Sequence, residues 1–344
     1  MNKRDIKNIT LNDLIKTMTL MGEKPYRAKQ VFYWLYKEGI HEFSEMKNIP
    51  KALKERLDKD HYISTIDVCE HLKSKDGSEK ILFKLHDGNF VETVLICAKY
   101  RETLCISTQV GCKFSCAFCA SGRNAFKRNL AAAEIINQIL HFSHHLKREL
   151  TNYVFMGMGE PLDNYENVSK AIAIMNDQNG MDIGARRITV STCGIIPGIE
   201  RLKELKLQIN LSVSLHAVNN RLRDVLVPVN KRYPLERLIK ACEDFKTKAG
   251  RMITLEYVLI KDINDSPEDA IGLSEITKQL KAKVNLIPYS EIPDLNYQTP
   301  LPEEMKKFMD RLIRRRVNVT LRESKGRDIQ AACGQLAGRE TRDT

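Results

Sequence analysis

Residues 111–119 read Gly-Cys-Lys-Phe-Ser-Cys-Ala-Phe-Cys, so that Cys112, Cys116 and Cys119 form a CxxxCxxC pattern. Iron–sulfur cubanes normally take four cysteine ligands. Three thiolates would hold a [4Fe–4S] cluster by three corners and leave its fourth iron open to a substrate or a cofactor. The number of ligands therefore predicts one cluster per chain, which acts as a reagent and not only as an electron carrier.

These cysteines could instead bind zinc or lie buried in a core. Zinc sites usually combine close cysteine pairs or add histidines at set spacings, and the nearest histidine downstream is His141. Buried structural thiols are common in protein cores, but Gly111, Lys113 and Ser115 in the same stretch are typical of a loop. The pattern favours the cluster over both.

The length and composition of the chain limit the classes of protein to which it can belong. The chain has 344 residues, 42% of them hydrophobic, which is enough for one large core and a smaller accessory unit. It starts with the polar residues 1–5, and no apolar run approaches the length of a membrane span. Nine cysteines without a secretory leader favour thiol or metal chemistry in a reducing compartment. We expect a cytoplasmic protein that does not contact membranes.

The charge of the chain points to a phosphate-rich partner. Lysine and arginine number 55 against 44 acidic residues, a net charge of +11, as expected of a protein that binds nucleic acid. A basic protein can also simply attract small anions. Local basic groups stand near expected strand or helix ends, where they could surround an active-site mouth. They are Lys147-Arg148, Arg186-Arg187, Lys231-Arg232, Arg314 to Arg316 and Arg322 to Arg327.

Within the first 97 residues, the spacing of apolar residues changes near residue 60 from a helical pattern to a strand pattern. Over residues 1–60, apolar residues such as Leu11, Leu14 and Met18 recur at helical spacing, and Pro25 and Pro50 mark helix starts. Residues 61–97 alternate apolar and polar around the turn 87–89, which indicates a β-hairpin. The sequence predicts a helical accessory domain that binds RNA over 1–60 and a hairpin extension over 61–97.

From residue 98 to 344, strand patterns alternate with helical ones, which is typical of a parallel βα barrel, open or closed. The cysteine loop follows the first expected strand, and the glycine-rich segment 156–161 follows the second. Active sites of βα barrels lie at these loops. The expected strands are 104–108, 153–156, 188–191, 209–215, 253–259, 284–288 and 317–321.

Several motifs carry a family resemblance. CxxxCxxC after the first strand and Gly159-Glu160 after the second resemble the radical S-adenosylmethionine (SAM) superfamily. Longer runs, residues 156–162, 214–217 and 331–338, resemble the RlmN/Cfr family of RNA (adenine) methyltransferases, and the likeness covers nearly the whole chain. It implies a partial (β/α)6 TIM-like barrel of the α/β class. It also implies that SAM binds the open iron and is cleaved to a 5′-deoxyadenosyl radical.

The resemblance also implies how the reaction proceeds. One SAM methylates Cys333, and a second SAM yields the radical that takes a hydrogen atom from that S-methyl group. The methylene radical then adds to adenine. Glu92 removes the ring proton as general base, and Cys105 releases the product by forming a transient disulfide with Cys333. Without the resemblance, Cys105 would be a core thiol and Glu92 a solvated strand carboxylate.

The remaining site residues are also implied by the family. Contacts to SAM fall on Gly159, Glu160, Ser191, Ser214, Leu215, His216 and Ser290. Ser290 stands where the family usually has asparagine, and its shorter side chain still donates and accepts a hydrogen bond. The other four cysteines match no catalytic motif and are expected to be structural. They are Cys69, Cys97, Cys193 and Cys242.

Three functions are compatible with these residues. The favoured one, whose substrates the resemblance implies, is methylation of adenosine C2 in 23S rRNA and in tRNA beside the anticodon, by a monomer supplied with electrons from an external, flavodoxin-like donor. The second is C8 methylation, as in the Cfr-type enzymes. Pro161 favours C2, because the C8 enzymes tend to have alanine at that position. The third is a zinc-stabilised RNA-binding protein without catalysis.

Overall fold

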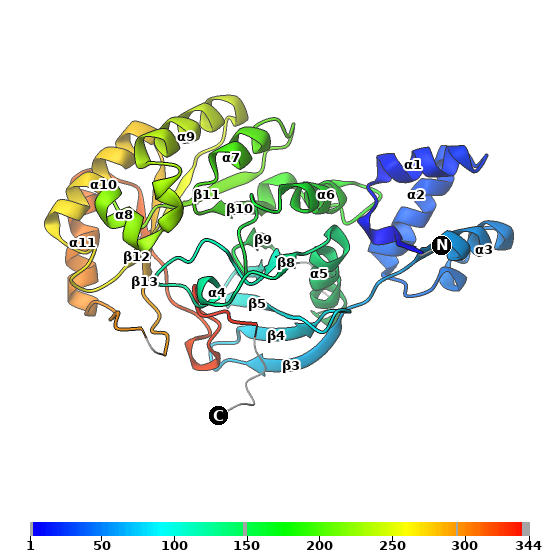
Figure 1. Cartoon of the computed structure of the whole chain (residues 1–344), viewed down its shortest axis with the longest axis horizontal. Coiled ribbons are helices and arrows are strands. Elements are labelled where there is room, and N and C mark those ends of the chain that lie inside the picture. The colour runs from blue at the N-terminus through cyan, green and yellow to red at the C-terminus, as the bar shows by residue number, and fades with distance from the viewer. Residues whose placement is uncertain (1–2, 147–149, 294, 339–344) are drawn as a thin grey trace.

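A ten-stranded sheet organises the molecule, which a computed structural model describes over residues 3–146, 150–293 and 295–338 (Figure 1). Its strand order is β14-β13-β12-β11-β10-β9-β6-β5-β4-β3. The strands are β3 (Asp67–Lys73), β4 (Glu79–Lys84), β5 (Phe90–Ala98), β6 (Arg101–Cys105), β9 (Asn152–Phe155), β10 (Ile188–Thr192), β11 (Asn210–Ser214), β12 (Thr254–Leu259), β13 (Lys283–Pro288) and β14 (Val319–Leu321). Since β14 and β3 are its two edges, the sheet does not close on itself.

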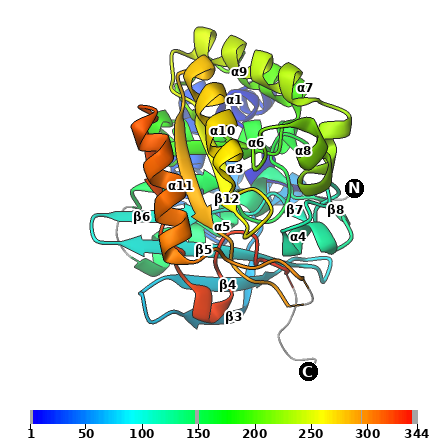
Figure 2. The same ribbon diagram turned by 90° about the vertical axis from the view of Figure 1, so that its left-hand side faces the viewer.

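In this sheet, the strands β6 and β9 to β14 are parallel and alternate with helices. The helices lie outside the sheet, and Figure 2 shows α9, α10 and α11 side by side along it. They are α4 (Ala120–Arg123), α5 (Ala132–Leu146), α6 (Tyr165–Asn176), α7 (Ile196–Leu202), α8 (Asn220–Leu226), α9 (Leu235–Ala249), α10 (Pro267–Leu280) and α11 (Pro302–Arg314). The predicted partial barrel is confirmed.

One predicted strand is wrong in its bounds. The sequence pattern predicts residues 104–108, but β6 ends at Cys105. Beyond it, the Ile106 N–H still donates to the Val154 carbonyl at 2.9 Å. The chain then turns into β7 (Gln109–Val110), which pairs with β8 (Arg128–Asn129) instead of with the main sheet. Cys105 therefore lies at the end of its strand, at the edge where the loops begin.

The predicted hairpin is confirmed and proves to be part of the same sheet. Strands β4 and β5 pair antiparallel, and the Leu85 N–H donates to the Asn89 carbonyl at 2.8 Å in the turn between them. A further strand, β3, was not predicted. Strand β5 also pairs antiparallel with β6, so that the extension β3–β5 continues the barrel sheet at one side.

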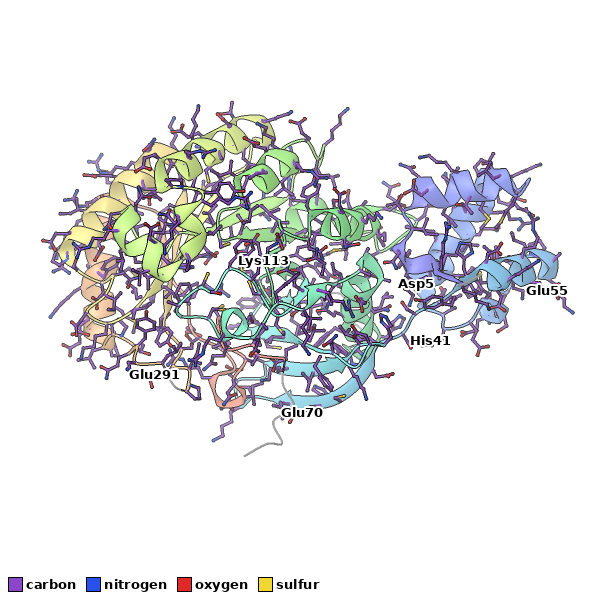
Figure 3. All side chains as sticks on the ribbon, viewed as in Figure 1. Asp5, His41, Glu55, Glu70, Lys113 and Glu291 are labelled. Atoms are coloured by element: carbon purple, nitrogen blue, oxygen red, sulfur yellow. The ribbon has the colours of Figure 1, made fainter. Side chains whose placement is uncertain are left out.

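A helical module precedes the sheet, with α1 (Leu11–Leu20), α2 (Pro25–Tyr33) and α3 (Lys51–Asp60). Thr10 caps α1 by accepting from the Asp13 N–H, and Pro25 occupies the first turn of α2. Met18, Phe32 and Leu57 are fully buried in the module's core. Figure 3 shows its labelled residues Asp5, His41 and Glu55 far from Lys113 of the cysteine loop. No helix in the described ranges is long and apolar enough to cross a membrane.

Lys7 joins this module to the barrel. Its ammonium donates to the Ser64 carbonyl at 2.9 Å and to Asn137 Oδ1 of α5 at 3.0 Å. Burial lowers the pKa of Lys7 to about 8, against a small opposing effect of Asp5. Because the unfolded chain then holds more protons than the folded one between pH 8 and the usual lysine pKa, Lys7 makes the protein more stable as the pH rises through that window.

We expect Lys7→Met to remove this pH dependence. Below about pH 8 the difference in unfolding free energy between wild type and variant should be constant. Above it the difference should move in favour of the wild type by up to about 1.4 kcal/mol per pH unit. Chemical denaturation of both proteins from pH 7 to 10 measures it. A difference that does not change with pH would contradict the assigned protonation.

Candidate active site

A pocket opens at the carboxyl ends of the parallel strands, with about 960 Å³ of empty space, including solvent at its mouth. Nine of the thirteen residues named from the sequence line it directly. The nine are Cys112, Cys116, Cys119, Gly159, Glu160, Ser191, Ser214, His216 and Cys333. Leu215 lies between two of these but is itself buried. Strand ends from across the barrel thus converge on one cavity.

The cysteine loop presents three thiols to this pocket. The Cys119 N–H donates to the Cys116 carbonyl at 3.1 Å, and the Ala117 N–H donates to the Leu226 carbonyl at the end of α8 at 3.0 Å. Burial raises the pKa of Cys112 to about 12, and it also raises the pKa of Cys116 and of Cys119. Such thiols stay protonated at neutral pH until metal ions displace the protons.

The donor set fits a three-ligand cubane. Three soft sulfur ligands share one cavity, and each would bind a different iron. Within the described residues no group of three or more His, Cys, Asp or Glu side chains is arranged around a single metal ion. A cubane does not require such an arrangement, because each of its thiolate ligands would bind a separate iron and not one shared ion.

Glu160 is fixed by the backbone around it. Its carboxylate accepts from the Cys193 N–H at 2.7 Å and from the Leu162 N–H at 3.0 Å, and its own N–H donates to Gln109 Oε1 at 2.8 Å. Burial raises the pKa of Glu160, and these hydrogen bonds oppose the shift. The side chain is therefore held still at the pocket wall.

His216 is a neutral imidazole in this site. Its Nδ1 accepts from the Val258 N–H at 3.0 Å, which leaves the proton on Nε2. Burial lowers the pKa of His216 to about 3, and the charge of Arg223 lowers it further. The residue has a positive φ of 58°, and its carbonyl accepts from Asn264 Nδ2 at 2.8 Å. The loop after β11 is thus locked in one conformation.

Three buried side-chain oxygens at the pocket side of the barrel have no hydrogen-bond partner among the described residues. They are Glu256 Oε2, the Tyr289 hydroxyl and Ser290 Oγ. Glu256 lines the pocket from β12, and its other oxygen accepts from Ser212 Oγ at 3.0 Å and from Asn285 Nδ2 at 3.1 Å. Buried polar atoms of this kind need a partner, and a bound ligand can supply one.

Glu256 lines the pocket although no sequence motif singled it out, and Arg322 lines it as well. Their charged groups lie 4.0 Å apart. A signal was present in the sequence for Glu256, because it is the one charged residue of the strand 254–259. Arg322 belongs to one of the basic groups expected at the mouth.

That expectation is wrong for Arg186 and Arg187. They precede β10, so they lie at the amino end of the strands, opposite the pocket, where Arg187 Nε donates to the Thr151 carbonyl at 2.8 Å. The pair Lys147-Arg148 lies outside the described residues.

Of the three residues expected to take part in methyl transfer, one lines the pocket and two are buried and do not line it. Cys333 is exposed and lines the pocket. Cys105 is buried at the end of β6 and does not line it. Burial raises the pKa of Cys105 to about 12, and the electrostatic effect of Cys333 raises it further. Glu92 is also buried, forms an ion pair with Lys80 at 2.8 Å, and is absent from the pocket wall.

An open parallel barrel with three cysteines, a glycine-glutamate loop and a pocket at the carboxyl ends of its strands defines a radical SAM enzyme. A family model described as the radical SAM superfamily matches residues 106–273, and one described as the ribosomal RNA large subunit methyltransferase N-terminal domain matches residues 4–63. The chain belongs to the RlmN family of RNA methyltransferases, as relatives that are 42% and 45% identical over nearly its whole length show. As a radical SAM enzyme it uses a [4Fe–4S] cluster and SAM.

Full-length relatives support this assignment. The chain is 45% identical to the dual-specificity RNA methyltransferase RlmN of Pelobacter propionicus, over 98% of this chain and 96% of that one. It is 42% identical to the probable RlmN of Clostridium novyi, over 97% of both. A crystal structure of a radical SAM methyltransferase from Sphaerobacter thermophilus matches with a TM-score of 0.91 and 40% identity, over 98% of this chain and all of that one. A non-catalytic zinc protein is therefore excluded.

Proposed function

We propose that this enzyme methylates C2 of adenosine in RNA and that the methyl carbon passes through Cys333. The observation that carries the proposal is the position of Cys333, which lines the same pocket as Cys112, Cys116, Cys119 and Glu160. Adenine C2 is an electron-poor ring carbon, so that direct polar attack on a methyl donor fails. A radical route through a carbon held by the protein avoids this problem.

When bound, the cluster and SAM supply the methyl group and the 5′-deoxyadenosyl radical, with two SAM consumed per turnover. Cys112, Cys116 and Cys119 would hold the cluster. Residues at the ends of successive strands would hold SAM: Gly159, Glu160, Ser191, Ser214, Leu215, His216 and Ser290. The unpartnered Ser290 Oγ and the Nε2–H of His216 would form hydrogen bonds with it.

The remaining steps belong to three side chains. The Cys333 sulfur accepts the methyl group and later presents its carbon to adenine. Glu92 takes the C2 proton of the adduct, and the unpaired electron that radical addition leaves on the adduct would be taken up by the oxidised cluster that Cys112, Cys116 and Cys119 would hold. The Cys105 thiolate then attacks the Cys333 sulfur, so that a sulfur–sulfur bond forms and the carbon–sulfur bond breaks. The electron pair of that bond stays on the released carbon, which takes up a proton to become the methyl group.

The substrates we propose are 23S rRNA and a tRNA adenosine beside the anticodon, in keeping with the dual-specificity RNA methyltransferase names of the relatives. The net charge of +11 suits both. We propose three regions: an RNA-binding accessory domain over 1–60, a β extension over 61–97 and the catalytic core over 98–344. We place the enzyme in the cytoplasm as a monomer that receives electrons from a flavodoxin-like donor.

The competing proposal is methylation at C8. Reconstituted enzyme, SAM, a reductant and unmodified rRNA or tRNA, combined without oxygen and followed by nucleoside mass spectrometry, separate the two. We expect 2-methyladenosine. A product containing only 8-methyladenosine would overturn the C2 assignment.

The glycine loop offers a prediction for SAM binding. Gly159 has a φ of +93°, and a Cβ there would lie 2.4 Å from Gln109 Cβ and 2.9 Å from the Gln109 nitrogen. Gln109 in turn holds the Glu160 N–H. We expect Gly159→Ala to displace Glu160 and weaken SAM binding by about tenfold or more, measured by equilibrium dialysis on reconstituted enzyme.

Gly22→Ala is the matched control for that variant. Gly22 also has a positive φ of 79°, but a Cβ there meets nothing within 4 Å, and it lies in the N-terminal module. It should carry the backbone strain without changing SAM affinity. Unchanged affinity in the Gly159 variant would mean that this loop does not shape the SAM site.

A further inference from the structure

The segment that carries Cys333, residues 326–338, is named here the Cys333 loop, and it is fastened to the antiparallel extension β3–β5. Figures 1 and 2 both show this red segment beside β3 and β4. In the turn between those strands, Asp76 Oδ2 accepts from the Gly326 N–H at 2.8 Å, and Ser74 Oγ donates to Asp328 Oδ1 at 2.6 Å. The extension therefore holds the entry of the loop.

One buried ion pair reaches both ends of the loop. Lys80 Nζ donates to the Gln330 carbonyl at 3.2 Å, on the side before Cys333. Glu92 Oε2 accepts from the Ala337 N–H at 2.6 Å and the Gly338 N–H at 2.9 Å, on the side after it. Lys80 Nζ and Glu92 Oε1 are 2.8 Å apart, with side chains only 5% and 6% exposed.

Between these two ends, the loop contacts the residues that follow the cysteine cluster motif. The Ala120 N–H donates to the Gly334 carbonyl at 2.7 Å, and Ser121 Oγ donates to the Leu336 carbonyl at 2.6 Å. Cys333 itself stays exposed. The position of its sulfur is therefore set by two groups of contacts. One comes from the Lys80–Glu92 ion pair, and the other comes from Ala120 and Ser121 of α4.

We propose that Lys80 is a positioning residue for Cys333, and that the Lys80–Glu92 pair clamps the Cys333 loop against the extension while the sulfur receives its methyl group. The inference rests on the proposed function, in which Cys333 carries the methyl carbon. It adds an order of events. Both carboxylate oxygens of Glu92 are engaged in the clamped state, so Glu92 takes the C2 proton only after Ala337 and Gly338 release it.

The test compares Lys80→Met with Lys80→Arg in reconstituted holoenzyme. Removing one partner of a buried ion pair leaves the other charge unpaired. In Lys80→Met we expect amide hydrogen exchange across 331–338 to speed up by about tenfold or more, and methylation of Cys333 by SAM in the absence of RNA to slow by a similar factor. Reductive SAM cleavage per cluster should stay within about twofold. Lys80→Arg should restore the first two.

Lys84→Met is the matched control, because Lys84 is an exposed lysine on the same strand β4. It should behave as wild type in all three measurements. Asp76→Asn is a milder second variant, which weakens the anchor at Gly326 without leaving a buried charge. It should speed up exchange in the same peptide by a smaller factor.

Two results would overturn the inference. Exchange at wild-type speed in both Lys80→Met and Asp76→Asn would show that there is no clamp. Faster exchange with an unchanged rate of Cys333 methylation would show that the clamp does not position the sulfur. If Cys333 of the wild type is never methylated, the proposed function fails, and loop exchange still decides whether the clamp exists.

Discussion

Cys333→Ala should abolish RNA methylation, a loss of about a thousandfold or more, while the enzyme still cleaves SAM under reduction. The physical reason is a division of tasks within one pocket. Cys333 lies on a loop outside the cysteine motif, and removing its sulfur leaves Cys112, Cys116 and Cys119 untouched. Liquid chromatography of 5′-deoxyadenosine and of digested RNA measures the two activities in the same reaction.

Cys69→Ala is the control for that experiment. Cys69 is also an exposed cysteine, but it lies on the edge strand β3 and not in the pocket. It should keep both activities. If Cys333→Ala lost SAM cleavage together with methylation, the sulfur would be needed for the structure of the site, and its role as a carbon carrier would lose its support.

Cys105→Ala should trap the enzyme on its substrate as a covalent protein–RNA adduct. In the proposed reaction the carbon–sulfur bond to Cys333 breaks only when a second sulfur attacks. Cys105 is buried at the end of β6, and its pKa is raised by burial and, to a lesser extent, by Cys333. Formation of the carbon–carbon bond does not need Cys105. In the variant, the carbon on Cys333 should therefore add to adenine, and the reaction should stop before the carbon–sulfur bond breaks. A denaturing gel with labelled RNA would show the slow-moving adduct.

Cys242→Ala is a close match for this variant. Cys242 is a buried thiol whose pKa burial also raises to about 12, but it lies on α9 and not beside Cys333. It should turn over normally without an adduct. Normal turnover by Cys105→Ala would remove Cys105 from the reaction, and absence of both turnover and adduct would place it before carbon–carbon bond formation.

Local sequence predicts those parts of the molecule whose structure depends on residues close together in the chain. Alternating strand and helix patterns located β9 to β14, because these strands are short and most of them, such as β12 and β13, are largely buried. The edge strand β14 is the most exposed of them. The cysteine spacing and the glycine loop located two walls of the pocket. In the module, Pro25 and Pro50 marked helix starts that the structure has at α2 and α3.

Features that depend on distant residues could not be predicted in this way. Strand β3 is a mostly exposed edge strand that pairs with β4. Because few of its side chains are buried, its sequence lacks the pattern of apolar residues that marks the other strands. Gln330 and Glu92 meet Lys80 across long stretches of chain, and no spacing rule joins them. Cys105 and Glu92 would have been assigned to the core and to the surface by local reasoning, and only the family resemblance gave them roles.

The origin of the methyl carbon is the central claim, and one labelling experiment tests it most directly. Enzyme whose Cys333 has been loaded with a fully deuterated methyl group would be given RNA and unlabelled SAM for a single turnover, and the nucleosides analysed by mass spectrometry. If Cys333 carries the carbon, the first product is 2-methyladenosine that retains two deuterium atoms, because the radical removes one and a solvent proton replaces it. A first product without deuterium would show that the carbon comes directly from SAM in solution, which would contradict the account.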